Sequence, residues 1–274
     1  VGSEMCIRDS SSSSVSADSG TVIAPPSAAE ALAANAKASH VEDSEWDASS
    51  AQTITLNGSS ASTSASGVKV DGSTVTITEA GVYKLSGTLN GQVKVEAAKD
   101  ARVVLILDGA TITNSSGSAI NVVSADDVVL SLNGSNTVTD GTPSDTNAED
   151  NAAIYSDADL TITGSGSLTV NANYNDGITS KDDLYILSGN ITVTSKDDAL
   201  RGKDSLTVAG GTIKLTSGGD GLKSDQDSDT TKGYVNITGG TIEITSTGDG
   251  IQGETDVILS LIHISEPTRL GMIS

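Results

Sequence analysis

Aromatic and sulfur-containing side chains are nearly absent from this chain. It contains no phenylalanine, one tryptophan, five tyrosines, one cysteine and two methionines. A single cysteine cannot form an intramolecular disulfide framework, and no Cys/His cluster with zinc-ligand spacing occurs. A core built without phenylalanine must therefore consist of isoleucine, valine, leucine and small residues.

Positive charge is also scarce. Fifteen Lys and Arg residues face 36 Asp and Glu residues, which gives a formal net charge of −21. Nucleic acid and anionic membranes both select basic surfaces, so neither is expected as a partner. No apolar run approaches the ~20 residues of a transmembrane helix, so no membrane insertion is predicted. Cations are the expected counter-charges of such a chain.

The two ends of the chain are related at the nucleotide level. VGSEMCIRDS (1–10) back-translates to a string whose reverse complement encodes LSLIHISEP (259–267). Protein termini have no physical reason to show this relationship, so we interpret 1–10 and 259–274 as translated sequencing adapter, not native protein. A signal segment cannot be recognised in what remains.

Residues 11–50 are rich in serine and alanine, a composition typical of a linker. Within this range AEALAANAKA (29–38) could form a short helix, and Trp46 is the only bulky side chain. We expect Trp46 to be a plug on the end of the folded domain, in preference to a platform for a sugar ring.

A repeat runs through residues 51–258. Ile154, Ile178, Leu200, Leu222 and Ile251 recur at separations of 24, 22, 22 and 29 residues, and aliphatic pairs and glycine corners follow them. A period near 22 with short strands predicts an all-β fold, a right-handed parallel β-helix of about 22 residues per rung. Polar insertions at 140–151 and 225–232 are predicted loops, and threonines should line the outside.

Aligning the rungs also aligns acidic residues. One column contains Asp176, Asp198, Asp220 and Asp249, and a second contains Asp182, Asp204 and Asp225, with Asp183 and Asp197 beside them. At the rung spacing, neighbouring carboxylates repel by about 0.8 kcal/mol in water and about 3 kcal/mol at an effective dielectric constant of 20. Ca²⁺ is the natural counter-ion, because it takes six to eight oxygen ligands in flexible geometry. The alternative is that these aspartates only cap turns.

Three basic residues fall among these acids: Arg201, Lys203 and Lys223. Surface ion pairs with the aspartates are one interpretation. Contact with the carboxylate of a ligand, which arginine can bind through two hydrogen bonds, is the second. A catalytic base is the third.

Several segments resemble a known family, among them YNDGITSKDDLYI, DDALRGKDSLTVAGGTIKLTS and GDGIQGETDV. Over 51–258 the chain is similar to clostridial carbohydrate-binding proteins that form a calcium-containing parallel β-helix associated with pectate and cellulose. The resemblance implies calcium ligands at Asp176, Asp182, Asp183, Asp197, Asp198, Asp204 and Asp220. The fold is also similar to that of pectate lyases, which bridge a uronate with calcium and use Arg or Lys as a base.

These observations predict a calcium-dependent, non-catalytic protein that binds acidic polysaccharide outside the cell or at its surface. Pectate is the first candidate ligand and cellulose the second, with Arg201, Lys203 and Lys223 as carbohydrate-binding residues. The scarcity of aromatic residues disfavours stacking on neutral sugar faces as the main source of affinity. Two alternatives stay open: a polysaccharide lyase with Arg201 as the base, and a structural or adhesin solenoid stiffened by calcium.

Overall fold

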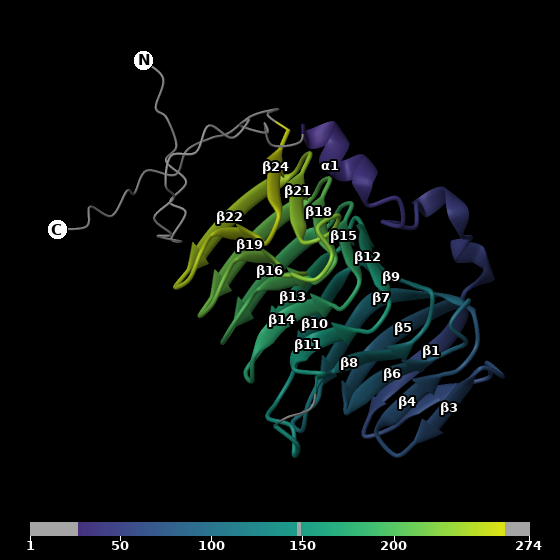
Figure 1. Cartoon of the computed structure of the whole chain (residues 1–274). Coiled ribbons are helices and arrows are strands. Elements are labelled where there is room, and N and C mark those ends of the chain that lie inside the picture. Colours follow the sequence, from purple (N-terminus) through teal and green to yellow (C-terminus); the bar gives the residue numbers. More distant parts are fainter. Residues whose placement is uncertain (1–26, 147–148, 261–274) are drawn as a thin grey trace, which may run out of the picture.

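The chain folds into a stack of parallel rungs. The structure is a computed structural model, and it describes residues 27–146 and 149–260. Figure 1 shows strands stacked in order from the N-terminal end near β1 to the C-terminal end near β24. Strands of successive rungs pair in parallel, and antiparallel pairs occur only at the N-terminal end, at β1–β2 and β3–β4, among the described residues. The predicted parallel β-solenoid is confirmed.

A nine-stranded sheet forms one side of the solenoid and is called the short-strand face below. Its members are β3 (Val68–Asp71), β4 (Thr74–Ile77), β6 (Gln92–Glu96), β8 (Ile120–Ser124), β11 (Ala152–Ser156), β14 (Asp176–Ser180), β17 (Leu200–Gly202), β20 (Leu222–Ser224) and β23 (Ile251–Gly253).

A fifteen-stranded sheet forms the rest of the wall. It divides at β7 (Arg102–Thr113), whose first half pairs with β9 and whose second half pairs with β10. One half is called the strap face, because residues 27–50 run along it. It contains β9 (Asp127–Asn133), β12 (Asp159–Gly164), β15 (Asp183–Ile186), β18 (Ser205–Val208), β21 (Tyr234–Ile237) and β24 (Asp256–Leu259). The threonine face contains β10 (Ser135–Thr139), β13 (Ser167–Asn171), β16 (Asn190–Ser195), β19 (Thr212–Ser217) and β22 (Thr241–Ser246). At the N-terminal end the sheet is completed by β1 (Gln52–Gly58), β2 (Ala61–Thr63) and β5 (Gly81–Asn90).

Aliphatic columns fill the interior. Leu200 is paired with Ile178 on one side and Leu222 on the other, and Leu222 is paired with Ile251. The first three are fully buried, while Ile251 in the last described rung is partly exposed. Each buried Leu or Ile side chain stabilises the fold by roughly 1.5–3 kcal/mol. The predicted interior column is confirmed, and so is its register of one rung per repeat.

Glycines make the corners before the threonine face. Gly189, Gly211 and Gly240 have φ values of 105°, 90° and 89°, in the region that glycine alone adopts readily. A Cβ atom on Gly211 would also lie 2.8 Å from the carbonyl oxygen of Gly189 in the rung before. Both the backbone angle and the close stacking of rungs therefore require glycine at these predicted corners.

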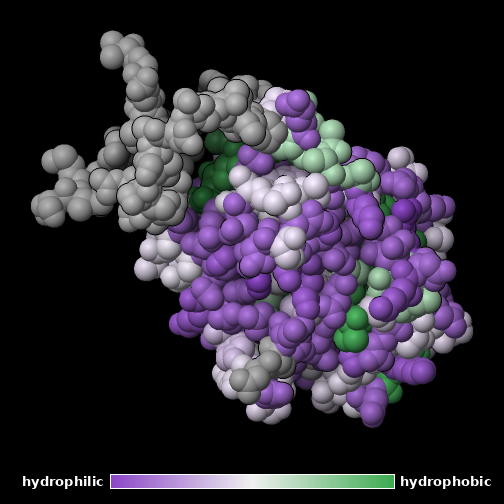
Figure 2. Space-filling model, viewed as in Figure 1, coloured by the Kyte–Doolittle hydropathy of each residue, from purple (hydrophilic) through white to green (hydrophobic). Residues whose placement is uncertain are grey.

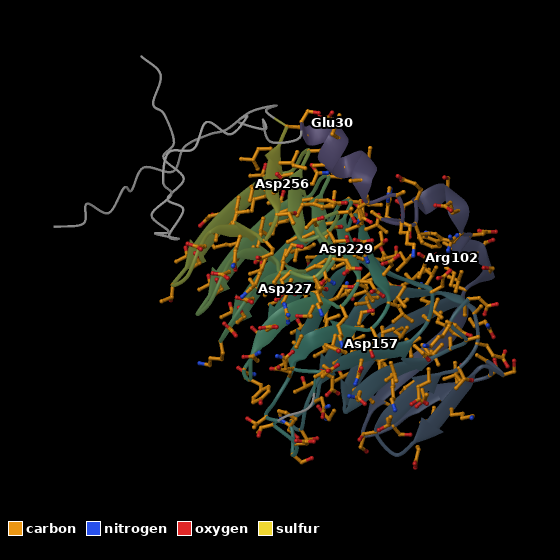
Figure 3. All side chains as sticks on the ribbon, viewed as in Figure 1. Glu30, Arg102, Asp157, Asp227, Asp229 and Asp256 are labelled. Carbon is orange, nitrogen blue, oxygen red and sulfur yellow. The ribbon has the colours of Figure 1, made fainter. Side chains whose placement is uncertain are left out.

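Residues 27–50, called the strap below, run along the outside of the strap face. The strap begins with α1 (Ala28–Ala34), whose N-terminus is capped by Ser27 and Glu30. Figure 1 shows α1 beside β21 and β24, and Figure 3 places Glu30 and Arg102 near opposite ends of the strap. The strap thus crosses the rungs from the C-terminal end of the solenoid back to β1.

Specific contacts hold the strap in place. The His40 ring stacks on Tyr185 with centroids 4.4 Å apart, and the Ser39 hydroxyl donates to Asp159 over 2.8 Å. Val41 is fully buried in a small apolar cluster with Val82, Val104, Ile106 and Val129, against which Trp46 packs. The sequence predicted a linker here and placed Trp46 on the end of the domain. In the structure the strap is docked, and Trp46 packs on the side of the solenoid because the outward faces of β5, β7 and β9 carry apolar side chains there, which the strap covers.

The predicted boundaries at the two ends stay predictions. Residues 1–10 and 261–274 lie outside the described residues. The last strand, β24, ends at Leu259, one residue beyond the predicted end of the native fold at 258.

Candidate functional site

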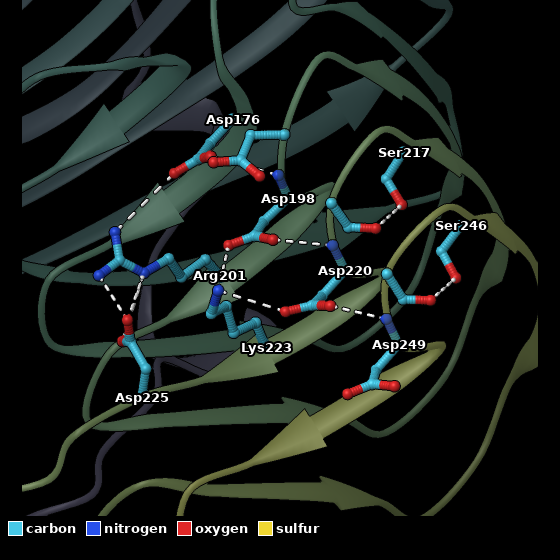
Figure 4. Close-up of polar contacts among 12 residues, drawn as sticks. Asp176, Asp198, Arg201, Ser217, Asp220, Lys223, Asp225, Ser246 and Asp249 are labelled. Carbon is cyan, nitrogen blue, oxygen red and sulfur yellow. Dashed lines mark hydrogen bonds and ion pairs between the residues drawn. The ribbon is translucent and has the colours of Figure 1, made fainter.

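The first acidic column lies at the corner between the threonine face and the short-strand face. The backbone N–H of Asp198 donates to Oδ1 of Asp176 (3.3 Å), that of Asp220 to Asp198 (2.8 Å), and that of Asp249 to Asp220 (2.7 Å). Figure 4 shows the four residues stacked in this order. The predicted column is confirmed, and backbone N–H groups satisfy one oxygen of each carboxylate except that of Asp249.

Two basic side chains separate the carboxylates of this column. Lys223 Nζ lies 2.9 Å from Oδ2 of Asp198 and 3.2 Å from Oδ2 of Asp220. Arg201 Nη1 lies 3.8 Å from Oδ2 of Asp176. Burial nevertheless raises the pKa of Asp176 to about 7, and the nearby carboxylate of Asp198 adds to the rise. The chain therefore supplies part of the counter-charge itself but leaves Asp176 in an unfavourable setting for an anion.

Asp197 completes a group of three carboxylates with Asp176 and Asp198. One oxygen from each residue lies within 4.8 Å of the others, and Asp197 is exposed while its two partners are buried. Burial, followed by repulsion from Asp198, also raises the pKa of Asp197. Three carboxylates, open to solvent on one side, form a donor set of the kind that calcium prefers.

The other edge of the short-strand face carries a second acidic group. Asp182, Asp183 and Asp204 line a groove of about 490 Å³ together with Asp157 and Asp159. Lys232 forms an ion pair with Asp204, and the hydroxyl of Ser205 donates to Asp183. Burial raises the pKa of Asp183 to about 6 and that of Asp159 to about 7.

Asp225 does not belong to this second column, in contrast to the sequence alignment. Both carboxylate oxygens of Asp225 accept hydrogen bonds from Arg201, the shortest 2.7 Å from Nη2. The backbone N–H of Gly233 bonds to the carbonyl of Asp204 in the position that continues the rung. The insertion 225–232 loops out before Gly233, so Gly233 and not Asp225 follows Asp204 in the next rung. Counting residues along the sequence therefore misplaced Asp225.

A basic cavity of about 270 Å³ opens on the short-strand face. Lys181, Arg201 and Lys203 contribute its positive charge, and Tyr155, Thr179, Ser180, Glu149 and Asn151 complete its lining. Lys181 forms an ion pair with Glu149. Lys203 forms no ion pair within the described ranges 27–146 and 149–260. Of the three predicted carbohydrate-binding residues, Arg201 and Lys203 line this cavity, while Lys223 is bound into the acidic column.

Sequence reasoning missed four residues of these sites: Asp159, Lys181, Lys232 and Tyr155. Asp159 directly precedes Leu160, and Asp183 directly precedes Leu184. Leu160 and Leu184 pair across neighbouring rungs, so the two aspartates occupy equivalent positions. Lys181 and Lys203 occupy equivalent places, since the N–H of Lys203 bonds to the carbonyl of Ser180. The repeat itself could have identified both residues. Lys232 lies in an insertion, where the repeat gives no register.

The accessible surface agrees with the composition. Figure 2 shows a face covered mainly by hydrophilic side chains, with small and scattered hydrophobic areas. Among the helices of the described chain, none has the length and apolar character needed to span a bilayer.

Known proteins with similar sequence or structure point to carbohydrate. The chain is 44% identical over 136 residues to a carbohydrate-binding domain-containing protein of Acetivibrio thermocellus, an overlap covering 46% of this chain and 47% of the relative. It thus aligns with about half the length of that curated relative. A solved polysaccharide lyase-like protein from C. thermocellum, a gadolinium derivative, matches with a TM-score of 0.72 and 35% identity, over 77% of this chain and 97% of that one.

A family model described as carbohydrate-binding domain-containing protein matches residues 71–265, which is more than half of the chain. This range includes every strand of the solenoid from β4 onward and both acidic groups. The chain therefore belongs to the carbohydrate-binding domain family.

Proposed function

We propose that this protein binds acidic polysaccharide, without cleaving it, at the cell surface or outside the cell. The observation that carries the proposal is the basic cavity formed by Lys181, Arg201 and Lys203 in a chain of net charge −21. A protein of this charge repels a polyanion at long range. Three basic side chains that converge on one cavity supply the local attraction that a uronate carboxylate needs, and Lys203 has its ammonium group available.

Calcium is the second part of the proposal. Asp176, Asp197 and Asp198 would hold the ion, since their oxygens are hard donors gathered within 4.8 Å. Bound calcium supplies positive charge that offsets carboxylate repulsion and favours uronate ligands. The solved relative is described as a gadolinium derivative, and gadolinium shares the preference of calcium for oxygen ligands. The group at Asp182, Asp183 and Asp204 is a second candidate site, in which Lys232 already offsets part of the charge.

A lyase activity with Arg201 as the base has less support. A base must release its proton, whereas the guanidinium of Arg201 donates to both oxygens of Asp225. The solved relative is described as polysaccharide lyase-like, so activity deserves a direct measurement. Near-ultraviolet absorbance of unsaturated uronate after incubation with polygalacturonate measures it, and a steady rise that Arg201→Ala abolishes would replace our proposal by the lyase.

Retention on immobilised polygalacturonate, compared with a neutral glucan, tests binding. We expect retention on polygalacturonate that chelation weakens more than any retention on the glucan. Lys203→Ala should weaken binding about tenfold, which corresponds to 1.4 kcal/mol. Lys214→Ala removes the same charge on the threonine face, where Lys214 pairs with Glu243, and should have little effect. Equal retention of the Lys203 and Lys214 variants would show that the cavity is not the binding site, and no retention at all would favour a structural solenoid.

A further inference from the structure

The basic cavity already contains one carboxylate. Glu149, at the end of the insertion 140–151, forms an ion pair with Lys181 Nζ in the same cavity that Lys203 and Arg201 line. Its side chain is 76% exposed, so the carboxylate reaches the cavity from the solvent side. Hydrogen bonding to Lys181, with further attraction from Lys181 and Lys203, lowers the pKa of Glu149, so it is an anion at neutral pH.

The backbone that carries Glu149 is anchored beside the cavity. The backbone carbonyl of Asp150 accepts a hydrogen bond of 2.9 Å from the Ser118 hydroxyl. The side-chain carboxylate of Asp150 accepts one of 2.7 Å from the Asn121 amide. The carbonyl of Asn151 accepts from the N–H of Asp176, the first strand residue of the next rung. Glu149 is thus tethered within reach of the cavity, while its own side chain stays largely in solvent.

Lys181 and Lys203 are stacked on neighbouring rungs, about 4.8 Å apart along the solenoid. Lys181 pairs with the carboxylate of Glu149 and, at 3.9 Å, with that of Asp157, while Lys203 lacks an ion-pair partner in the described part of the chain. Of the two stacked ammonium groups, that of Lys203 can therefore accept a further negative charge. A carboxylate on an external ligand can therefore bind at Lys203 and compete with Glu149 for Lys181.

We propose that Glu149 is a built-in competitor that occupies the place of a ligand carboxylate and sets the affinity of the cavity for uronates. The inference rests on the proposed function and adds to it a specificity-determining residue. The exposed Glu149–Lys181 pair is of the kind that contributes little to stability. A ligand that brings several carboxylates on one chain gains by displacing Glu149, whereas a neutral sugar gains nothing.

Substitution of Glu149 by glutamine tests the inference, with trigalacturonate as the probe in isothermal titration of the full chain. We expect Glu149→Gln to bind about two- to fivefold more tightly than the unsubstituted protein, the scale of one surface ion pair. Glu243→Gln is the matched control, because it removes the same charge from a comparable exposed pair with Lys214 on the threonine face. The control should bind as the unsubstituted protein does.

A double-mutant cycle assigns the gain to Lys181. Lys181→Ala should weaken binding, and adding Glu149→Gln to it should give no further gain. Equal gains for Glu149→Gln and Glu243→Gln would overturn the inference, because the cause would then be net charge alone. No gain for Glu149→Gln, while Lys203→Ala still weakens binding, would also overturn it and leave the proposed function intact. If Lys203→Ala and Lys181→Ala both bind normally, the proposed function fails at this cavity and the inference fails with it.

Discussion

The backbone N–H of Asp220 donates a 2.8 Å hydrogen bond to Oδ1 of Asp198 in the preceding rung. The second oxygen of Asp198 lies 2.9 Å from Lys223 Nζ. The carboxylate of Asp198 thus links its own rung to the backbone of the next rung, and it also binds the ammonium group of Lys223. This arrangement explains how closely stacked carboxylates can be tolerated, and it defines what a metal ion must compete with.

Asp198→Asn should remove most of the calcium dependence of thermal stability. The amide oxygen can still accept from Asp220, but a negative ligand is lost from the group with Asp176 and Asp197. A ligand that binds only the folded state stabilises it by about 2.7 kcal/mol at a hundred times its dissociation constant. Melting curves with calcium and with chelator should therefore differ for the unsubstituted protein and nearly coincide for Asp198→Asn.

Asp71→Asn serves as the control for charge, since Asp71 is exposed on β3 at the far end of the solenoid. Its melting curves should keep the full calcium dependence. If the unsubstituted protein gives coincident curves with calcium and with chelator, the calcium site is wrong, and the aspartates act only as turn and ladder residues.

Leu200→Asp should unfold the central rungs. Leu200 is fully buried between Ile178 and Leu222, and a carboxylate there finds no cationic partner inside the aliphatic column. The milder Leu200→Ala should cost about 2–5 kcal/mol in the free energy of unfolding. Thr192→Ala, an exposed position on β16, should cost far less. Chemical denaturation measures all three, and a Leu200→Ala cost as small as that of Thr192→Ala would contradict the column.

Asp140→Asn should stabilise the protein at neutral pH. Burial raises the pKa of Asp140 to about 6, and hydrogen bonds from Asn173 and Tyr174 only partly oppose this. The folded state then holds the proton more tightly than the unfolded state, whose pKa is about 3.9. The free energy of unfolding must fall as pH rises from about 4 to about 6 and stay lower above that.

The asparagine variant cannot ionise, so its gain over the unsubstituted protein should be absent near pH 4, grow between pH 4 and pH 6, and stay constant above that at about 2 kcal/mol. Denaturation midpoints at pH 4, 6 and 7.5 give the comparison. A pH-independent difference between the two proteins would mean that Asp140 ionises normally.

Val41→Ala should loosen the strap without unfolding the solenoid. Val41 is fully buried against Val82, Val104 and Ile106, and losing two methyl groups there costs about 1–2 kcal/mol. Limited proteolysis should therefore cut the strap faster in this variant, while the rungs stay protected. Ala48→Gly, at an exposed strap position, is the control for local chain flexibility. Equal cleavage rates for the unsubstituted protein and the Val41 variant would restore the linker interpretation.

The sequence alone determined the solenoid, its period and one of its two acidic columns. Each rung repeats the same environment, so a residue such as Leu200 has the same neighbours above and below as Ile178 does. Aliphatic positions, glycine corners and the series Asp176, Asp198, Asp220 and Asp249 could therefore be predicted from spacing. Lys181 and Asp159 follow the same repeat and were within reach of the same reasoning.

Only the tertiary structure decided which side chains meet where the repeat is broken or left. Asp225 and Lys232 lie in the insertion 225–232, which has no counterpart in other rungs. Spacing therefore placed Asp225 in the wrong column and gave Lys232 no partner. Glu149 reaches Lys181 from a second insertion, and Val41 docks from a segment whose composition predicts a linker. Contacts of this kind depend on how chain segments outside the repeat fold back on it, and periodicity carries no information about that.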